Sequence, residues 1–378
     1  MEYIMNLALS EFQQAIRDAA RSFLAKECSI DVVREIQESP LGYSSELWQR
    51  IAALGWPGLL IPEEYGGIGA SFTDLVVLLE ETGRALLPSP LISTVLCALA
   101  IDSAGNGDQK RAFLPKIASG ELKMSLALTE PSASVDSAAI STTAISQQDS
   151  YSVTGTKLFV RDAGVSDYLL VIVRTADGRD DGVSLLLVEA SAPGITITPL
   201  KTIGRDRQCE VVFESVPVSR ANLLGAPGQA WPLVDKLVQW GAVAECAEMV
   251  GAGQQSFDFA VGYAKDRVLF GRPLGSFQVV QHKCADLFTD VEGSRMLTYY
   301  AAWKLSEGLP ATADVSRAKV WVSEALRRVT REAHQIHGGI AYIIEHPLHL
   351  YFQRQKTSEM AYGDVDYHLR RVAHDLLD

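Results

Sequence analysis

Three separated segments of the chain carry side chains that could hold a polar, phosphate-rich ligand. In Leu128-Thr129-Glu130-Pro131, a threonine hydroxyl and exposed backbone amides could meet a polar ring or a phosphate. The segment from Arg267 to Gln278 places an arginine and an aromatic residue at a helix end, before a Gly/Pro turn. The segment from Gln335 to Gly339 ends in paired glycines that permit close backbone approach. Each segment alone also has a structural interpretation, such as an arginine that caps a helix C-terminus.

Other motifs point away from common chemistries. Two glycine clusters superficially suggest dinucleotide binding, but neither follows a strand and opens a βαβ helix. We interpret them as turn and close-packing glycines: Gly66, Gly67, Gly69, Gly251 and Gly253. Two histidine pairs lack the spacing of a helical zinc site, so we expect packing or surface histidines and no metal: His334/His337 and His346/His349. The nucleophile elbow G-x-S-x-G is missing.

Composition narrows the class of protein further. The 378 residues are 47% hydrophobic and 21% charged, which suits two or three domains with real cores. The net charge of -12 argues against a nucleic-acid partner. Five scattered cysteines indicate neither a disulfide framework nor a zinc site. No apolar run reaches the roughly 18 residues of a membrane span, and the N-terminus lacks a signal-peptide pattern, so we expect a soluble cytoplasmic protein without a membrane partner.

The elements that must position these residues fall into three blocks, and the fold class is α+β. Helical spacing dominates residues 1–122, beginning with a capping box at Ser10 and Gln13. Further helices are predicted at Leu47–Leu54, Thr73–Ala85 and Leu91–Ala104, with a loop at Pro62–Gly69. Residues 229–378 are helical again, with long apolar helices at 231–263 and 311–337 that we expect to pack as a bundle, partly covered by another subunit.

Between these helical blocks, residues 123–228 have the texture of an all-β domain. Short apolar and β-branched runs predict strands at 151–160, 168–173, 183–189, 195–198 and 209–218, with a turn at 176–182. Because no helices intervene, we expect an antiparallel sheet or barrel.

Taken together and in this order, the segments resemble the acyl-CoA dehydrogenase family over nearly the whole chain. The residues that carry the resemblance are PEEYGGIG, LTEP, VTGTKLFV, FESVPVSRANLLG, RVLFGRPLGSFQ and QIHGGIAYIIEHPL. The resemblance implies an N-terminal helical domain (1–122), a middle β-barrel-like domain (123–228) and a C-terminal four-helix-bundle domain (229–378). It also implies FAD-dependent 2,3-dehydrogenation of an acyl-CoA thioester, in a tetramer that passes electrons to an electron-transfer flavoprotein.

The family pattern also assigns cofactor contacts to this chain. By resemblance, Thr129 lies beside the flavin ring, and Arg267, Phe270 and Gln278 are offered to a neighbouring subunit's FAD. The loop from Gln335 through Gly338 and Gly339 contacts the adenine side. The remaining expected cofactor contacts are Phe159, Arg161 and Asp364.

The expected catalytic base is missing from the sequence. In most relatives a glutamate precedes Gly-Thr near the C-terminus, and this place is taken by Tyr362. A minority of relatives place the glutamate on the first long C-terminal helix, and this place is taken by Gly241. Weak substitutes are Glu245 and Glu248, one to two helical turns beyond Gly241, and Asp364. Tyr362 itself has an ordinary pKa near 10, poorly matched to neutral pH.

Two further departures surround the flavin position. The family's aromatic-Ile-Thr becomes Phe159-Val160-Arg161, so a long cation replaces a short hydroxyl. Arg161 could block the flavin ring or hold an anionic group. The glycine-rich continuation of TEP becomes Ser132-Ala133-Ser134-Val135.

Three functions therefore stay open. The first is the base-lacking subunit of a heteromeric acyl-CoA dehydrogenase, paired with a homologous subunit. The second is a homotetrameric FAD enzyme with a displaced base or different chemistry. The third is a non-catalytic acyl-CoA-binding module.

Overall fold

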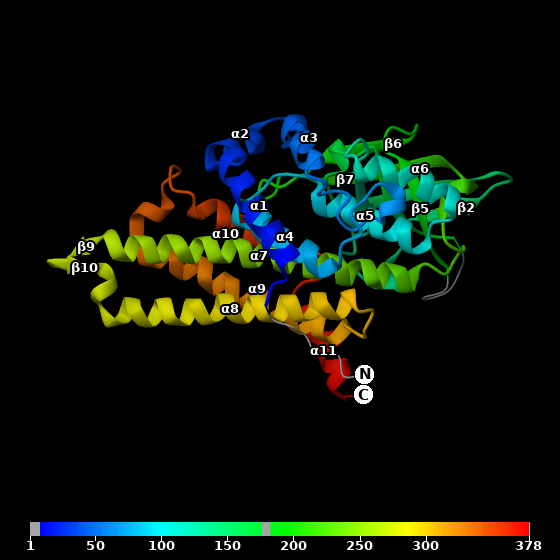
Figure 1. Cartoon of the computed structure of the whole chain (residues 1–378). Helices are drawn as coiled ribbons and strands as arrows, with labels where there is room; N and C mark the ends of the chain where they lie inside the picture. Colours follow the sequence, from blue (N-terminus) through cyan, green and yellow to red (C-terminus); the bar gives the residue numbers. More distant parts are fainter. Residues whose placement is uncertain (1–7, 176–181, 378) are drawn as a thin grey trace. The chain divides into compact units, whose positions relative to one another are not determined.

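The computed structural model describes residues 8–175 and 182–377 (Figure 1). The turn predicted at 176–182 lies outside the described residues except for Gly182. The chain forms two compact units, which are described separately. We call residues 8–35, 71–87 and 239–377 the helical unit, and residues 36–70, 88–175 and 182–238 the sheet unit. The predicted domain boundaries after residues 122 and 228 stay predictions.

Six α-helices occupy the described residues before the first strand. They are α1 (Glu11–Glu27), α2 (Ile30–Glu38), α3 (Ser45–Ala53), α4 (Phe72–Arg84), α5 (Leu91–Ala104) and α6 (Gly107–Ala118). The capping box predicted at Ser10 and Gln13 is present, and Ser71 and Asn106 begin α4 and α6 in the same way. Local side-chain caps therefore set where these helices start. A 3-10 turn, Glu63–Tyr65, lies within the predicted loop.

The middle of the chain folds as one eight-stranded sheet in the order β6-β7-β3-β2-β4-β5-β8, with β1 paired to β4. Its strands are β1 (Met124–Ala127), β2 (Thr143–Ser146), β3 (Ser150–Arg161), β4 (Tyr168–Arg174), β5 (Val183–Glu189), β6 (Ile195–Pro199), β7 (Gln208–Ser219) and β8 (Leu223–Leu224). All five predicted strands are confirmed.

The sheet is mainly antiparallel, as predicted, but β1 and β2 both run parallel to β4. The sequence interpretation included neither short strand. The β4 and β5 residues are buried along almost their whole length, and a core that includes Val153, Val171 and Phe213 holds the sheet together.

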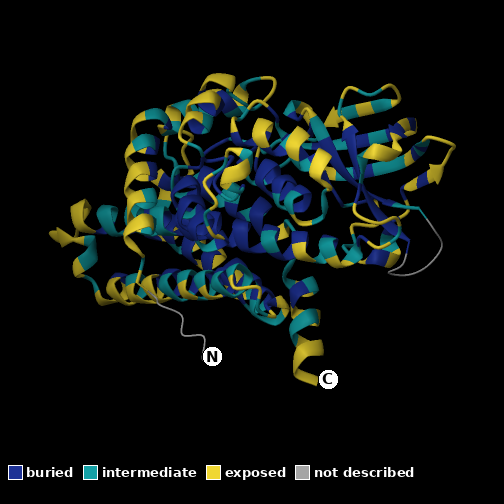
Figure 2. Cartoon of the chain, turned by 45° about the vertical axis from the view of Figure 1, so that its right-hand side comes forward, coloured by how far each residue is buried: buried dark blue, intermediate teal, exposed yellow. Residues whose placement is uncertain are grey.

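The last part of the chain is helical, as predicted. It contains α7 (Trp231–Asp266), α8 (Gln278–Ser306), α9 (Thr312–His337), α10 (Leu348–Met360) and α11 (Val365–Leu377), with a small hairpin of β9 (Val268–Leu269) and β10 (Arg272–Pro273). Val250, Leu287 and Leu326 lie in the core that joins α7, α8 and α9. Beyond the four helices of the expected bundle, α11 packs on α9 as a fifth helix, and its last turn is exposed (Figure 2). None of the described helices has the length and apolar content needed to cross a bilayer.

Close-packing glycines explain both glycine clusters. A Cβ atom on Gly251 would lie 1.8 Å from the backbone oxygen of Glu80, so α7 and α4 approach closely at this point. A Cβ atom on Gly67 would lie 2.0 Å from the oxygen of Ile61, inside the predicted loop. Gly66 and Gly69 are turn residues with φ of 81° and 68°, so the interpretation of the clusters as turn and close-packing glycines is confirmed.

Replacing Gly251 with alanine should therefore force α7 away from α4. We expect Gly251→Ala to lower the free energy of unfolding by about 2 kcal/mol, the range of an overpacked core, measured by urea denaturation. The matched control is Gly262→Ala on the same helix, because a Cβ atom there meets no atom within 4 Å. This control should leave stability unchanged or raise it slightly. Equal effects of the two substitutions would contradict the close-packing explanation.

Candidate functional site

The segment that contains Thr129 is held by a buried ion pair. Glu130 and Lys157 are almost fully buried, and the Lys157 Nζ atom lies 2.7 Å from Glu130 Oε1. The same carboxylate accepts hydrogen bonds from the backbone N–H groups of Ser141, at 2.7 Å, and Thr142, at 2.9 Å. Lys157 also donates to the Leu128 carbonyl at 3.2 Å. The pair thus joins β1, β3 and the 130–142 loop around Thr129.

The charge state of this pair follows from its surroundings. Burial alone would raise the pKa of Glu130, but the charge of Lys157 and the hydrogen bonds from Lys157, Ser141 and Thr142 outweigh burial and lower the pKa to about 2. Glu130 is therefore a carboxylate at neutral pH with its oxygens occupied. It positions the neighbouring threonine and does not act as a base.

Thr129 and Phe159, two expected flavin contacts, lie together in the sheet unit. The Leu158 N–H donates to the Thr129 carbonyl at 2.8 Å, which ties the end of β1 to a bulge in β3. At this bulge Phe159 takes a positive φ of 55° and is 50% exposed. A phenyl ring exposed by strained backbone is available to a flat ligand.

Arg161 follows at the end of β3 and is fixed by its neighbours. The Ser125 hydroxyl donates to the Arg161 carbonyl, and the next residue, Asp162, is buried at a φ of 59°. Asp162 accepts hydrogen bonds from the Ser93 hydroxyl and from Arg207 Nε, each at 2.6 Å. The backbone at the arginine that departs from the family pattern is thus fixed, and the arginine side chain is half buried.

The segment Ser132–Val135 keeps a turn without glycine. Ala133 has a φ of 55°, and its N–H donates to the Glu130 carbonyl at 2.8 Å. The Ser134 hydroxyl donates to the Asp136 carboxylate at 2.8 Å. The backbone therefore adopts a conformation that glycine would favour, although alanine stands there.

In the helical unit, the structure brings into contact the two positions at which the resemblance expects a base. A Cβ atom on Gly241 would lie 2.5 Å from Cδ1 of Tyr362, so the tyrosine ring lies against the glycine of α7. Tyr362 is in the turn between α10 and α11 and has a φ of 56°. The sequence analysis identified both positions, but only the fold shows that they are in contact with each other.

A buried histidine holds this turn. Burial, aided by nearby Lys319, lowers the pKa of His368 to about 3, so its ring is neutral. Because a carbonyl can only accept, Nε2 donates to the Tyr362 carbonyl, while Nδ1 accepts from the Ser316 hydroxyl, both at 3.1 Å. The turn that carries Tyr362 is therefore fastened to α11 and α9. The sequence interpretation missed His368, since nothing in its spacing marks it.

The substitute bases have other surroundings. Glu248 accepts from the Thr82 hydroxyl at 3.1 Å and lies 3.4 Å from Arg354 Nη1, so it is paired. Asp364 accepts from the Tyr367 N–H at 2.8 Å and caps the start of α11. Glu245 is fully buried within α7. Glu245 and Glu248 are thus buried, and the partly exposed Asp364 is occupied as a helix cap.

The hairpin after α7 presents the segment from Arg267 to Gln278. Phe270 is 93% exposed at a φ of 53°, at the turn between β9 and β10. Its ring meets Phe277 edge to face at 6.3 Å, and the Arg272 guanidinium lies 4.0 Å from the Phe277 ring centre. Arg267 is exposed at the base of the hairpin, and Gln278 begins α8. The sequence interpretation missed the Arg272–Phe277 stack, which stiffens the hairpin.

The Gln335–Gly339 segment ends α9. Gly338 has a φ of 67°, and a Cβ atom on Gly338 or Gly339 would meet no atom within 4 Å, which leaves the backbone accessible. His337 is buried and stacks on Tyr263 with a 4.5 Å ring separation, and it contacts the His346 ring at 4.8 Å. His337 and His334 are therefore packing residues. Among the described residues, no group of three or more His, Cys, Asp or Glu side chains is arranged to hold a metal ion.

Family models match almost the whole chain. The description "Acyl-CoA dehydrogenase, N-terminal domain" matches residues 10–121, the middle-domain description 125–216 and the C-terminal description 228–377. Acryloyl-CoA reductase (NADH) of Anaerotignum propionicum is 30% identical over 99% of this chain and 96% of that protein.

Solved structures agree with the family models. The butyryl-CoA dehydrogenase of Megasphaera elsdenii matches with a TM-score of 0.93 and 30% identity, covering 99% of this chain and 100% of that chain. A chain of the ChsE4-ChsE5 complex of Mycobacterium tuberculosis matches with a TM-score of 0.91 and 28% identity, covering 99% of this chain and 99% of that chain.

The Glu130–Lys157 pair gives a testable consequence. Because the folded pKa of Glu130 is below the ordinary value, its stabilisation is present above about pH 4.5 and is lost as the pH falls toward 2. At pH 7, Glu130→Gln should cost about 3 kcal/mol of unfolding free energy, since it leaves a buried lysine charge. The matched double variant Glu130→Gln with Lys157→Met should recover much of this loss. A single variant within 1 kcal/mol of the parent by urea denaturation would contradict the assignment.

Proposed function

The chain belongs to the acyl-CoA dehydrogenase family, and from this premise we propose that it is the base-lacking subunit of a heteromeric enzyme that dehydrogenates an acyl-CoA thioester. Its partner would be a homologous subunit that carries the glutamate, and both would act in the cytoplasm. An electron-transfer flavoprotein would accept the electrons.

One observation carries this proposal: Gly241 and Tyr362, the two positions at which the family resemblance expects the base, lie against each other, and neither carries a carboxylate. The Tyr362 ring takes the space that a side chain at position 241 would need. A carboxylate cannot arise from Gly241 without moving this ring. The neighbouring carboxylates do not compensate, because Glu248 is paired with Arg354 and Asp364 caps α11. The α-proton of a thioester thus meets a phenol in place of a base.

The residues expected to contact FAD fit a flat, phosphate-bearing cofactor within each unit. Phe159 is half exposed beside Thr129, and the Gly338–Gly339 backbone is open to close approach. Phe270 is almost fully exposed at its hairpin, beside the exposed Arg267. Bound FAD would supply the hydride acceptor for the reaction. Arg161 is the residue that departs from the family's flavin-binding pattern, because it places a cation where that pattern has threonine.

Loss of the base together with retention of the hairpin favours a heteromeric role. Arg267, Phe270 and Gln278 are the residues that one family subunit offers to its neighbour's FAD. A chain without a base still completes its neighbour's site if these residues remain. The similarity to the ChsE4-ChsE5 complex supports a pairing of two homologous chains.

Purification alone and with a base-bearing homologous subunit tests the proposal. We expect the pair to hold FAD and its visible absorbance to bleach on anaerobic addition of acyl-CoA, and this chain alone not to bleach. Bleaching of the chain alone would support a homotetrameric enzyme, and thioester binding without flavin in either preparation would support a binding module. Both outcomes contradict the proposal.

Arg267 should contribute to FAD binding in the enzyme formed by the two subunits. We expect Arg267→Ala in this chain to lower the FAD content of the purified pair severalfold, because it removes a cation expected at the pyrophosphate of the partner's FAD. The matched control is Arg370→Ala, an exposed arginine on α11. Unchanged flavin-to-protein absorbance ratios in Arg267→Ala would contradict the donated role.

A glutamate at position 362 should restore a base. In a pair whose partner subunit has lost its own glutamate, we expect Tyr362→Glu to raise the rate of flavin bleaching by about 100-fold, the lower range for general-base catalysis. The control is Tyr362→Gln, which has nearly the same shape and no basic group. Equal rates for the two variants would show that position 362 does not face the α-carbon.

A further inference from the structure

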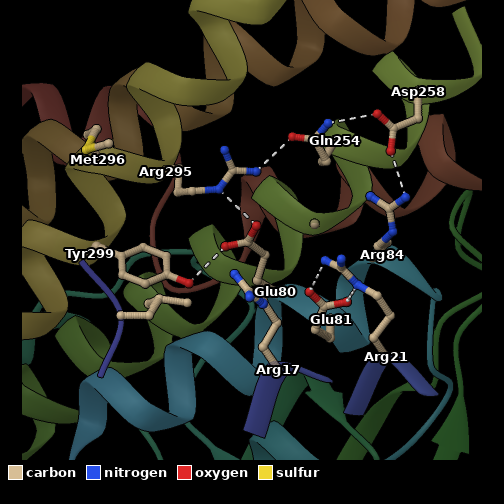
Figure 3. Close-up of a pocket in the computed structure, with 12 residues that line it drawn as sticks. Arg17, Arg21, Glu80, Glu81, Arg84, Gln254, Asp258, Arg295, Met296 and Tyr299 are labelled. Carbon is tan, nitrogen blue, oxygen red and sulfur yellow. Dashed lines mark hydrogen bonds and ion pairs between the residues drawn. The ribbon is translucent and has the colours of Figure 1, made fainter. Parts of the chain in front are cut away.

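A pocket of about 460 Å³ lies inside the helical unit, beside the close contact of Gly251 with Glu80 (Figure 3). Four helices, α1, α4, α7 and α8, supply most of its lining. Among the described residues that line it are four arginines and three carboxylates. Pockets of this size accommodate small organic molecules. The chemistry of its occupant depends on which hydrogen-bonding atoms the protein leaves available.

The carboxylates of the pocket are already satisfied. Glu80 accepts from Arg295 Nε at 2.9 Å on one oxygen and from the Tyr299 hydroxyl at 3.0 Å on the other. Glu81 accepts from Arg21 Nη2 at 2.6 Å and from Nε at 3.0 Å. Each of these four oxygens thus already accepts a hydrogen bond from within the protein.

Asp258 completes the set in the same way. Its two oxygens accept from Arg84 Nη2 at 2.7 Å and from Gln254 Nε2 at 2.9 Å. Gln254 in turn accepts from Arg295 Nη2 at 2.8 Å. The chain of bonds from Arg84 to Arg295 therefore forms one wall whose acceptors are used within the protein (Figure 3).

Hydrogen-bond donors, in contrast, are in surplus. Arg17 is not needed by any carboxylate that lines the pocket, since its bond goes to Asp18, its neighbour in sequence, at 3.3 Å. Arg84 uses Nη2 for Asp258, and a guanidinium carries five N–H donors. Figure 3 shows Arg17 and Arg21 entering from α1 with their guanidinium groups toward the glutamates. Leu9 and Met296 add apolar surface.

We propose that this pocket binds a small organic anion, whose carboxylate or phosphate oxygens accept from Arg17 and Arg84 and whose apolar part contacts Leu9 and Met296. The proposal does not depend on the function proposed above. The chain's net charge of -12 disfavours non-specific anion binding, so an anion that stabilises this protein requires a local site. The ligand would bridge α1 to α4 and α8 and so stabilise the helical unit.

Thermal unfolding of the full chain in increasing concentrations of inorganic phosphate or of butyrate tests this site. Sodium chloride at matched ionic strength is the reference. We expect one or both anions at about tenfold above their dissociation constant to raise the unfolding midpoint by about 2 °C more than chloride does. A larger shift with butyrate identifies a carboxylate ligand with an apolar body, and a larger shift with phosphate identifies a phosphate ligand.

Two variants localise the effect. Arg17→Gln removes a partly exposed donor, and Met296→Trp fills the pocket without removing a charge. Both should abolish the extra shift. The matched control is Arg111→Gln, an exposed arginine of the sheet unit that is likewise paired with a nearby surface aspartate and should retain the shift. The proposal is overturned if neither anion exceeds chloride, or if the shift persists in Arg17→Gln and Met296→Trp.

Discussion

The contact between the Tyr362 ring and Gly241 decides what the helical unit can do. Two positions far apart in the sequence compete for one volume, because a Cβ atom on the glycine would lie 2.5 Å from the ring. The volume holds either a ring from the α10–α11 turn or a side chain from α7. In this chain it holds the ring, and a tyrosine there supplies no carboxylate that could act as a general base. This steric choice governs the chemistry that the rest of the fold can support.

Buried polar side chains fix the conformation of three irregular segments of the chain. A buried neutral His368 fastens the turn of Tyr362, a buried Asp162 fastens the end of β3, and the Glu130 carboxylate fastens the 130–142 loop. In each case a buried polar group is hydrogen-bonded to the backbone or to an opposite charge, which removes the penalty of burial. These groups position neighbouring residues and are not themselves placed to react.

Sequence patterns predicted the regular parts of the fold well, for local reasons. Hydrophobic spacing and capping residues located α1, α4, α5 and the five longer strands, since these signals lie within a few residues of one another. The parallel pairing of β1 and β2 with β4 escaped prediction because four-residue strands carry almost no periodicity. The candidate site was predicted as a set of residues, but the contact of Gly241 with Tyr362 and the anchoring role of His368 depend on how α7, α9 and α11 pack.

Backbone strain indicates which of the three functions the fold still supports. Eight non-glycine residues among those described have a positive φ, and five of them lie at the candidate site: Ala133, Phe159, Asp162, Phe270 and Tyr362. A strained residue of this kind costs on the order of 1 kcal/mol and persists where the surrounding structure enforces it. Two of the five, Phe159 and Phe270, hold aromatic rings out into solvent, which adds the cost of exposed apolar surface. A module without a flat ligand would gain stability by relaxing both. The strain therefore favours a chain that still presents both rings to a flat ligand.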